Sequence, residues 1–224
     1  MSVVNLPPIL RVMWNELEAR VRKLETAQIF QAPPLAVNPI VLRDGMIWYR
    51  TDLDMYFTYA NGAVRAIGEM RYYGSFFDTT TQSLGSTASV YAIALGTTDA
   101  SNGVSITNGS EILIANAGVY NIQHSLQFDN SSAANLNADV FLRKNGVDVA
   151  SSDGQVGIMP KKGAVNGTMI ASWNYIVTAA AGDKFQLYWT AEATTVRIVT
   201  IPASVSPPHP SAPSVIVTVT QVAW

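Results

Sequence analysis

The sequence predicts a mainly β protein preceded by one amphipathic helix, and three observations lead to this fold class. Residues 71–224 contain short apolar segments separated by Gly, Asn, Asp and Pro turns, without helical periodicity, which is typical of a β-sandwich. Residues 43–70 follow a period-two pattern with turn signals, which predicts a small β meander. Residues 10–28 repeat apolar side chains every seven residues, which predicts a coiled-coil helix.

The composition excludes several classes of function. The 224-residue chain is 48% hydrophobic and 13% charged, with a net charge of −2. Its Lys/Arg runs are no longer than pairs such as Lys161-Lys162, so we expect no nucleic-acid partner. The apolar runs are shorter than the roughly 18 residues that cross a bilayer, and the first residues lack a signal-peptide pattern, so we expect no membrane insertion. The absence of Cys excludes disulfides and thiol chemistry.

Charge is unevenly distributed along the chain. Residues 1–70 hold 14 of the 30 charged side chains, whereas the remaining residues are rich in Ser, Thr and Asn. The chain is therefore expected to divide near residue 70. The predicted parts are an N-terminal anchoring helix over 1–28, a Pro-rich linker over 29–42, a small β meander over 43–70 and a head over 71–224.

The N-terminal helix is expected to begin near Pro7-Pro8 and to stop before Pro33-Pro34. Its heptad register places Arg20 at g and Glu25 at the following e, the spacing of an interchain salt bridge. The string from Arg20 to Glu25, RVRKLE, resembles the Arg-h-x-x-h-Glu motif of trimeric coiled coils, in which h is hydrophobic. An amphipathic helix packed on its own domain is the alternative interpretation. The predicted trimerisation residues are Leu10, Trp14, Leu17, Arg20, Val21, Leu24 and Glu25.

The meander is predicted to contain strands at 46–50, 55–59 and 63–67, with a hairpin turn at Asn61-Gly62. The string from Asp44 to Tyr49, DGMIWY, resembles a small aromatic β module that is common in phage virion proteins. The downstream residues that continue this resemblance are Tyr56, Tyr59, Gly62 and Val64. The aromatic cluster of the meander fits two roles, packing in a core or between subunits and, as an alternative, binding a sugar.

The head is predicted to contain about ten short strands. The expected strands are 71–77, 90–95, 111–115, 118–128, 139–144, 148–151, 168–177, 184–190, 196–201 and 214–223. The segments AGVYNIQHSLQF (117–128), FLRKNG (141–146) and AGDKFQL (181–187) resemble strands and turns of complement-head and tumour-necrosis-factor-like jelly rolls, in the same order. The apolar closing strand also fits this family. The resemblance implies a jelly-roll β-sandwich that assembles as a homotrimer, and it carries no calcium or receptor residues over to this chain.

No residue pattern in the sequence predicts catalysis. The chain has only two histidines. His124 shares a strand face with apolar residues, which predicts a hydrogen-bonded core or interface histidine; an ion site on a threefold axis is the alternative. His209 lies in a proline-rich loop. Turn aspartates such as Asp129 and Asp153 are too scattered to predict an acid pair for glycan cleavage, and we expect no metal or cofactor.

Three polar or Pro-rich segments, 129–137, 152–167 and 202–213, are predicted to be long loops that display binding residues. The candidate display residues are Asn130, Asn135, Lys161, Lys162, Pro208 and His209.

Together these resemblances predict a structural, non-enzymatic protein on the virion surface of a tailed bacteriophage. The favoured role is capsid decoration, as a cement or head-fibre protein that docks by its N-terminal part. A short tail fibre that binds the host is the first alternative, and a cellular receptor-binding ligand module is an alternative of another class. The expected partners are further copies of the chain, a capsid or tail protein, and a host surface glycan or protein.

Overall fold

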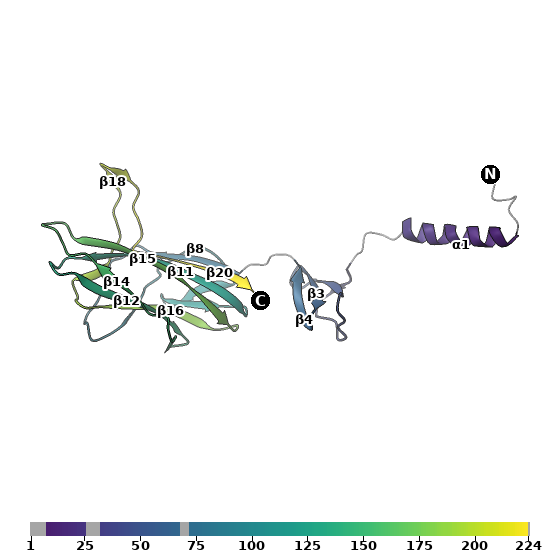
Figure 1. Cartoon of the computed structure of the whole chain (residues 1–224), viewed down its shortest axis with the longest axis horizontal. Helices are drawn as coiled ribbons and strands as arrows, with labels where there is room; N and C mark the ends of the chain where they lie inside the picture. Colours follow the sequence, from purple (N-terminus) through teal and green to yellow (C-terminus); the bar gives the residue numbers. More distant parts are fainter. Residues whose placement is uncertain (1–7, 26–31, 68–71, 224) are drawn as a thin grey trace. The chain divides into compact units, whose positions relative to one another are not determined.

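The computed structural model describes residues 8–25, 32–67 and 72–223, with side chains of the helix described at residues 10 and 12–19 (Figure 1). The chain divides into two compact units, residues 1–70 and 71–224. The structure is mainly β, with several antiparallel sheets. None of the described helices combines the length and the apolar character that crossing a membrane requires.

The first unit contains one helix and one four-stranded sheet. The helix, α1, spans Pro8–Glu25, and a proline in its first turn is tolerated because the first N–H groups have no partner within the helix. The sheet has the order β1-β2-β3-β4. Its strands are β1 (Pro34–Leu35), β2 (Ile47–Arg50), β3 (Met55–Ala60) and β4 (Ala63–Ile67).

The predicted meander strands are confirmed, and the hairpin between β3 and β4 has the expected turn. Asn61 and Gly62 both have positive φ, at 52° and 73°, as a two-residue turn of this kind requires. The linker prediction needs a correction. Pro34–Leu35 pairs in parallel with Tyr49–Arg50, so this part of the chain is an edge strand of the sheet instead of a free linker.

The second unit consists of two sheets that share one hydrophobic core, an arrangement compatible with a β-sandwich. In the first, which we call the β11 sheet, β11 pairs with β15 along one edge and with β20 and β17 along the other; β5 and β8 follow β20, and β6 follows β17. Its strands are β5 (Tyr73–Asp78), β6 (Gln82–Ser83), β8 (Thr97–Asn102), β11 (Gly118–Asn130), β15 (Gly167–Ala179), β17 (Val196–Ile198) and β20 (Val215–Ala223).

The second sheet, the β12 sheet, has the order β13-β12-β16-β10-β9, with β14 paired to β12 and β7 paired to β16. Its strands are β7 (Tyr91–Ala92), β9 (Val104–Thr107), β10 (Glu111–Ile114), β12 (Leu136–Lys144), β13 (Val147–Asp148), β14 (Gly154–Ile158) and β16 (Lys184–Ala191). A separate two-residue hairpin joins β18 (Ser204–Val205) to β19 (Pro208–His209).

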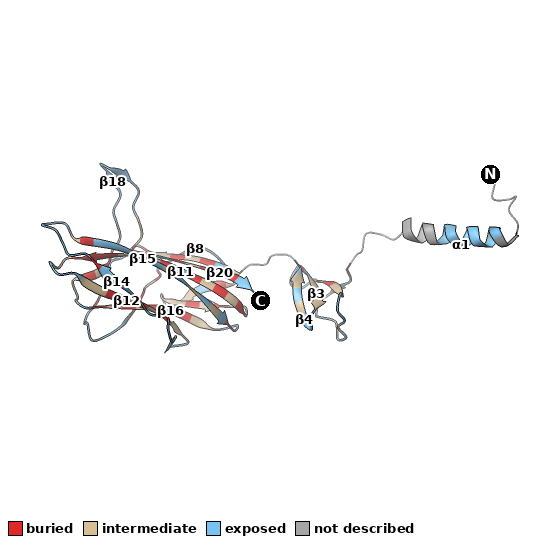
Figure 2. Cartoon of the chain, viewed as in Figure 1, coloured by how far each residue is buried: buried red, intermediate tan, exposed pale blue. Residues whose placement is uncertain are grey.

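The core lies between the two sheets because successive side chains of a strand point to opposite faces. Tyr120, Ile122, Leu126 and Phe128 of β11 are buried, and they belong to the same cluster as inward residues of the β12 sheet. Figure 2 shows the buried residues concentrated in the strands of this unit. Every predicted strand of the head overlaps an observed strand, although 148–151 shares only Asp148 with β13, whereas β6, β8, β9, β14, β18 and β19 were not predicted.

Candidate functional site

The main candidate surface is the outer side of the β11 sheet, which we call the uncharged face. It is formed by the outward side chains of β5, β20, β11 and β15, whose burial alternates residue by residue. The pairing places these side chains in rows; one row consists of Ser75, Thr218, Gln123 and Asn174. The full set is Tyr73, Ser75, Phe77, Val119, Asn121, Gln123, Ser125, Gln127, Thr168, Ile170, Ser172, Asn174, Ile176, Thr178, Ile216, Thr218, Thr220 and Val222. None of these side chains is charged, and the charged residues on the same side of the sheet lie at its margins. Asp99 of β8 accepts from the Ser75 hydroxyl at 3.4 Å, and the Asp129–Arg197 pair lies where β11 ends.

Several large apolar side chains of the uncharged face are open to solvent. Ile170 and Ile176, both on β15, are 59% and 61% exposed. Tyr73, Ile216 and Val222 are also exposed. Contiguous exposed apolar surface is typical of a protein–protein contact, whereas single exposed apolar residues need no explanation. In the strand register, polar residues of β11 such as Asn121 and Gln127 separate these apolar side chains, so they do not form one patch. The low charge of the face, and not a continuous apolar area, makes it a candidate interaction surface.

Some of the polar side chains of this face are held by hydrogen bonds. The side-chain amide of Asn174 donates to Asn121 Oδ1 at 2.9 Å, across the β11–β15 pair. The Ser172 hydroxyl donates to the backbone oxygen of His124 at 2.8 Å. Side chains that are held in this way lose little further conformational freedom when a partner covers them. The uncharged face is therefore suited to burial against a complementary surface.

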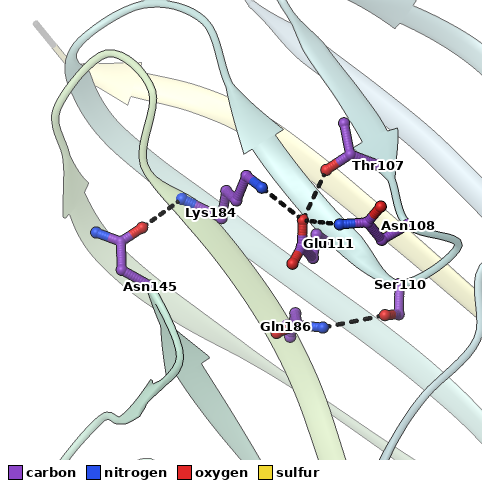
Figure 3. A network of polar contacts seen from close by, with 7 residues as sticks. All are labelled: Thr107, Asn108, Ser110, Glu111, Asn145, Lys184 and Gln186. Carbon is purple, nitrogen blue, oxygen red and sulfur yellow. Dashed lines mark hydrogen bonds and ion pairs between the residues drawn. The ribbon is translucent and has the colours of Figure 1, made fainter.

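The outer side of the β12 sheet differs in chemistry. Glu111 Oε2 accepts hydrogen bonds from Thr107 at 3.0 Å and Asn108 at 2.9 Å, and it lies 2.7 Å from Lys184 Nζ (Figure 3). The contact with Lys184 is the main cause that lowers the pKa of Glu111. In the same view, Gln186 donates to Ser110 at 3.0 Å. These groups connect β9, β10 and β16, so the network has a structural role.

A second carboxylate lies beside this network. Asp183 Oδ2 lies 2.7 Å from Lys144 Nζ, and Asp183 Oδ1 accepts from the Asn145 amide at 2.8 Å. The hydrogen bond from Lys144, followed by that from Asn145, lowers the pKa of Asp183 to about 2. Asn145 Oδ1 in turn accepts from the backbone N–H of Lys184 at 2.9 Å (Figure 3). A carboxylate with so low a pKa does not act as a general acid near neutral pH.

The prediction that Asn130 is a display residue is wrong. Asn130 ends β11 and is completely buried. Its amide donates to the backbone oxygens of Ala134 and Met159 at 2.8 and 3.2 Å, and its Oδ1 accepts from the N–H of Ser132 at 2.8 Å. Asn side chains favour such backbone bonds at turns. Asn130 therefore fixes the loop after β11 instead of facing a partner.

The neighbouring Asp129 has a similar holding role. Arg197 Nη2 lies 2.7 Å from Asp129 Oδ2, and Arg197 Nε donates to Oδ1 at 3.1 Å, so the pair is bidentate. The Asn166 amide also donates to Oδ2 at 2.7 Å, which ties the 159–166 loop to β11. The Asp129 carboxylate is fully used by these contacts.

The other predicted display residues lie on the surface. Asn135, Lys161 and Lys162 are exposed, and so are Pro208 and His209. The segment predicted as the 152–167 loop contains β14, so only its second half is a loop. Whether any of these residues binds a partner stays a prediction.

The β18–β19 hairpin projects from the second unit, at the upper left of Figure 1. Val205 at its turn is 94% exposed. The chain from 200 to 223 contains no charged residue. His209 Nδ1 lies 2.9 Å from the backbone oxygen of Pro210. The hairpin is thus an uncharged projection with an apolar end, and it is the most prominent of the predicted display loops.

The heptad positions of α1 that the structure describes are open to solvent. Leu10, Trp14 and Leu17 are exposed, and Figure 2 shows the described part of the helix as exposed throughout. Whether these side chains pack on further copies of the helix or on their own domain stays a prediction. Arg20, Val21, Leu24 and Glu25 lie within α1, but their side chains fall outside the described part of the chain.

The aromatic cluster of the meander is mostly committed to packing. Trp48 is completely buried and stacks on Phe57, with ring centroids 6.1 Å apart. Tyr49 packs against Tyr56, with centroids 5.0 Å apart. A buried Trp48 cannot stack on a sugar, which disfavours the sugar-binding alternative.

His124 is buried, as predicted, but the expected hydrogen bond is absent. In the described structure neither ring nitrogen of His124 has a hydrogen-bond partner. Within the described residues, 8–25, 32–67 and 72–223, no group of three or more His, Asp or Glu side chains could bind a metal ion.

No protein-family model matches the chain, and no curated protein is significantly similar to it in sequence.

The uncharged face was not among the predicted sites. The signal was present in the sequence, because 167–179 and 215–223 place only uncharged residues at alternate positions. Recognising that these positions share one surface requires the pairing of β15, β11, β20 and β5, which residue order alone does not give.

Proposed function

We propose that this chain is a homotrimeric structural protein of a tailed-phage virion, which docks on the capsid by its N-terminal part and displays jelly-roll heads. The observation that carries the proposal is the uncharged face, because a large exposed sheet surface without charge is suited to contact with further copies. The resemblance of 117–128, 141–146 and 181–187 to trimeric jelly-roll heads supports the same conclusion.

The strand order supports a jelly roll. The eight main strands in chain order are β5, β10, β11, β12, β14, β15, β16 and β20. In the β11 sheet the neighbours are β5, β20, β11 and β15, which are the first, eighth, third and sixth of these strands. In the β12 sheet the neighbours are β10, β16, β12 and β14, which are the second, seventh, fourth and fifth. This is the order that two Greek keys produce in an eight-stranded jelly roll.

The heptad pattern of the helix sequence is a reason to propose a trimer, but α1 is too short to hold one alone. Its 18 residues span about 27 Å, and isolated helices near this length are marginal in water. We therefore assign most of the stability of the trimer to the heads. We assign attachment to the particle to α1. Three joined heads also gain in effective concentration when each makes a weak contact.

A short tail fibre is the second candidate function. The projecting β18–β19 hairpin favours it, because an uncharged exposed tip is suited to binding a receptor on the host surface. The short α1 favours decoration, because a fibre requires a longer shaft.

Two measurements test the proposal. Sedimentation of the full chain should give three times the 24.1 kDa chain mass, and a monomer would refute the trimer and the proposal built on it. The number of copies on a purified virion should be in the hundreds for a decoration protein. A few tens of copies would instead favour the tail fibre.

A further inference from the structure

His124 occupies an unusual position for an ionisable side chain. It lies in the middle of β11 and is 1% exposed. The other inward residues of β11 around it, such as Ile122 and Leu126, are apolar. A leucine or phenylalanine would fill this position without placing two polar nitrogens in the core, so packing alone does not account for the imidazole.

The surroundings of His124 leave both ring nitrogens without a partner. The Trp173 ring meets the imidazole edge-on at 4.5 Å between centroids, and the Tyr175 ring stacks on it at 5.8 Å. These two neighbours bond to each other, because Trp173 Nε1 donates to the Tyr175 hydroxyl at 2.8 Å. The Tyr175 hydroxyl in turn donates to the backbone oxygen of Val140 at 3.5 Å. The polar groups nearest to the imidazole are thus already used.

No described acidic group compensates a charge on this ring. The residue paired with His124 on β20 is Val217, and the titratable group that β15 contributes is Tyr175. Asp153, just before β14, interacts electrostatically with Tyr175, and Asp139 of β12 raises the pKa of Asp153. Neither carboxylate has a described hydrogen bond or ion pair with His124. Burial without a counter-ion lowers the pKa of His124 to about 4.

We propose that His124 is an acid switch of the head, in which protonation of the buried imidazole weakens the packing of β15 against the sandwich core. A protonated imidazole must donate two hydrogen bonds, and its present site offers no acceptor for either. The Trp173 and Tyr175 rings cover it, so exposing the imidazole to water on this side requires them to separate from it. Both belong to β15, which pairs with the rest of the head along β11 alone.

The switch has a consequence for assembly that rests on the proposed function. β15 also carries Ile170 and Ile176, the two most exposed apolar residues that it gives to the uncharged face. Displacing β15 therefore disturbs the surface proposed to join the heads. In mildly acidic solution the trimer should weaken together with the fold.

The direction of the pH effect follows from linkage. Because the pKa of His124 in the folded chain lies below its ordinary value of 6.5, the unfolded chain binds the proton more readily. Unfolding should therefore become easier as the pH falls from 7.5 to 4.5, by a factor of about 70 in the equilibrium constant. Burial and the neighbouring Asp139 raise the pKa of Asp153, so Asp153 acts in the opposite direction. Asp183 acts mainly below pH 4, because its pKa is about 2.

The test is denaturant unfolding of the full chain at several pH values between 7.5 and 4.5. The wild type should lose stability over this range, and His124→Phe, which keeps a planar ring, should lose much less. His209→Gln removes the other histidine, which is exposed, and should behave like the wild type. Equal pH slopes in the wild type and in His124→Phe would overturn the proposal.

Two further measurements, NMR of the histidine side chains and sedimentation at each pH, test the proposal independently of the His124→Phe variant. If His124→Phe does not fold, NMR of histidine side chains in the wild type should show the His124 ring neutral down to about pH 4 in the folded state. A His124 ring that is protonated at pH 6 in the folded chain would refute the switch. Sedimentation at each pH separates this proposal from the trimer, since a chain that is monomeric throughout can still show the His124-dependent loss of stability.

Discussion

Gln123→Glu should abolish association of the heads without unfolding them. Gln123 lies in the middle of the uncharged face, between Thr218 and Asn174, and it is exposed in the single chain. Glutamate has nearly the same shape as glutamine, so the change adds one negative charge and little else. Surface substitutions of this kind usually alter stability by less than about 0.5 kcal/mol.

The magnitude follows from what the face can contribute. Ile170 and Ile176 are about 60% exposed, so covering each contributes about 1–2 kcal/mol. Tyr73, Ile216 and Val222 add smaller amounts, which brings the apolar contribution to about 5 kcal/mol for each chain. An unpaired charge buried in an interface costs about 3–5 kcal/mol, and a symmetric trimer buries three of them. The introduced charges therefore cancel most of the association energy.

The measurement is sedimentation of wild-type and Gln123→Glu chains at equal concentration, together with circular dichroism to verify folding. Gln186→Glu is the matched control, because it places the same charge on the outer side of the β12 sheet. There the carboxylate lies opposite Arg143 and can accept from the Ser110 hydroxyl. The control should remain trimeric. A folded Gln123→Glu chain that still sediments as a trimer would show that the uncharged face is not the interface.

Three further predictions concern other parts of the chain. Asp183→Asn should remove part of the acid destabilisation below pH 4. The lowered pKa of Asp183 stabilises the fold above about pH 4, and this stabilisation is lost towards pH 2. Acid unfolding followed by fluorescence measures the difference between the variant and the wild type. Gly167→Ala should destabilise the head by about 1–3 kcal/mol in denaturant unfolding, since a Cβ would overlap a backbone carbonyl, whereas Gly157→Ala has room and should be nearly neutral. Leu17→Asp combined with Leu24→Asp should leave the head trimeric but abolish binding to the particle in a co-sedimentation assay; dissociation into monomers would show that the helix holds the trimer.

The strands that the sequence revealed are those with one buried face. β16 alternates buried and partly exposed residues along its whole length, and β11 alternates buried and more exposed residues as far as Phe128; this period-two pattern is visible in the residue order. β8 was missed because all six of its residues are exposed at an edge of the β11 sheet. Its residues, TTDASN, have no apolar alternation to detect. Edge strands are placed by pairing with a neighbour, which a local pattern does not encode.

The candidate sites were predicted less well than the strands, for a physical reason. Asn130 has the composition of a display residue, but its side chain satisfies three backbone groups in the fold. His124 was correctly expected to be buried, since it lies on the apolar side of β11. Its missing hydrogen bonds could not be predicted, because they depend on Trp173 and Tyr175 from a strand about 50 residues away. Local patterns give the direction of a side chain, and tertiary contacts give its chemistry.

The contrast between the two sheets links these findings to assembly. In the β12 sheet the outward charges are paired with one another or stacked on rings, as Arg143 is on Tyr188 at 3.9 Å, so this side is complete in a single chain. On the β11 sheet Asn174 bonds to Asn121, while Ile170 and Ile176 remain in water. Removing apolar area from water is favourable, and the charges on this side of the sheet, Asp99 and the Asp129–Arg197 pair, lie at its margins. Association through the β11 sheet therefore lowers the free energy of the head more than association through the β12 sheet does. Further copies should meet at the uncharged face and leave the β12 sheet facing outward.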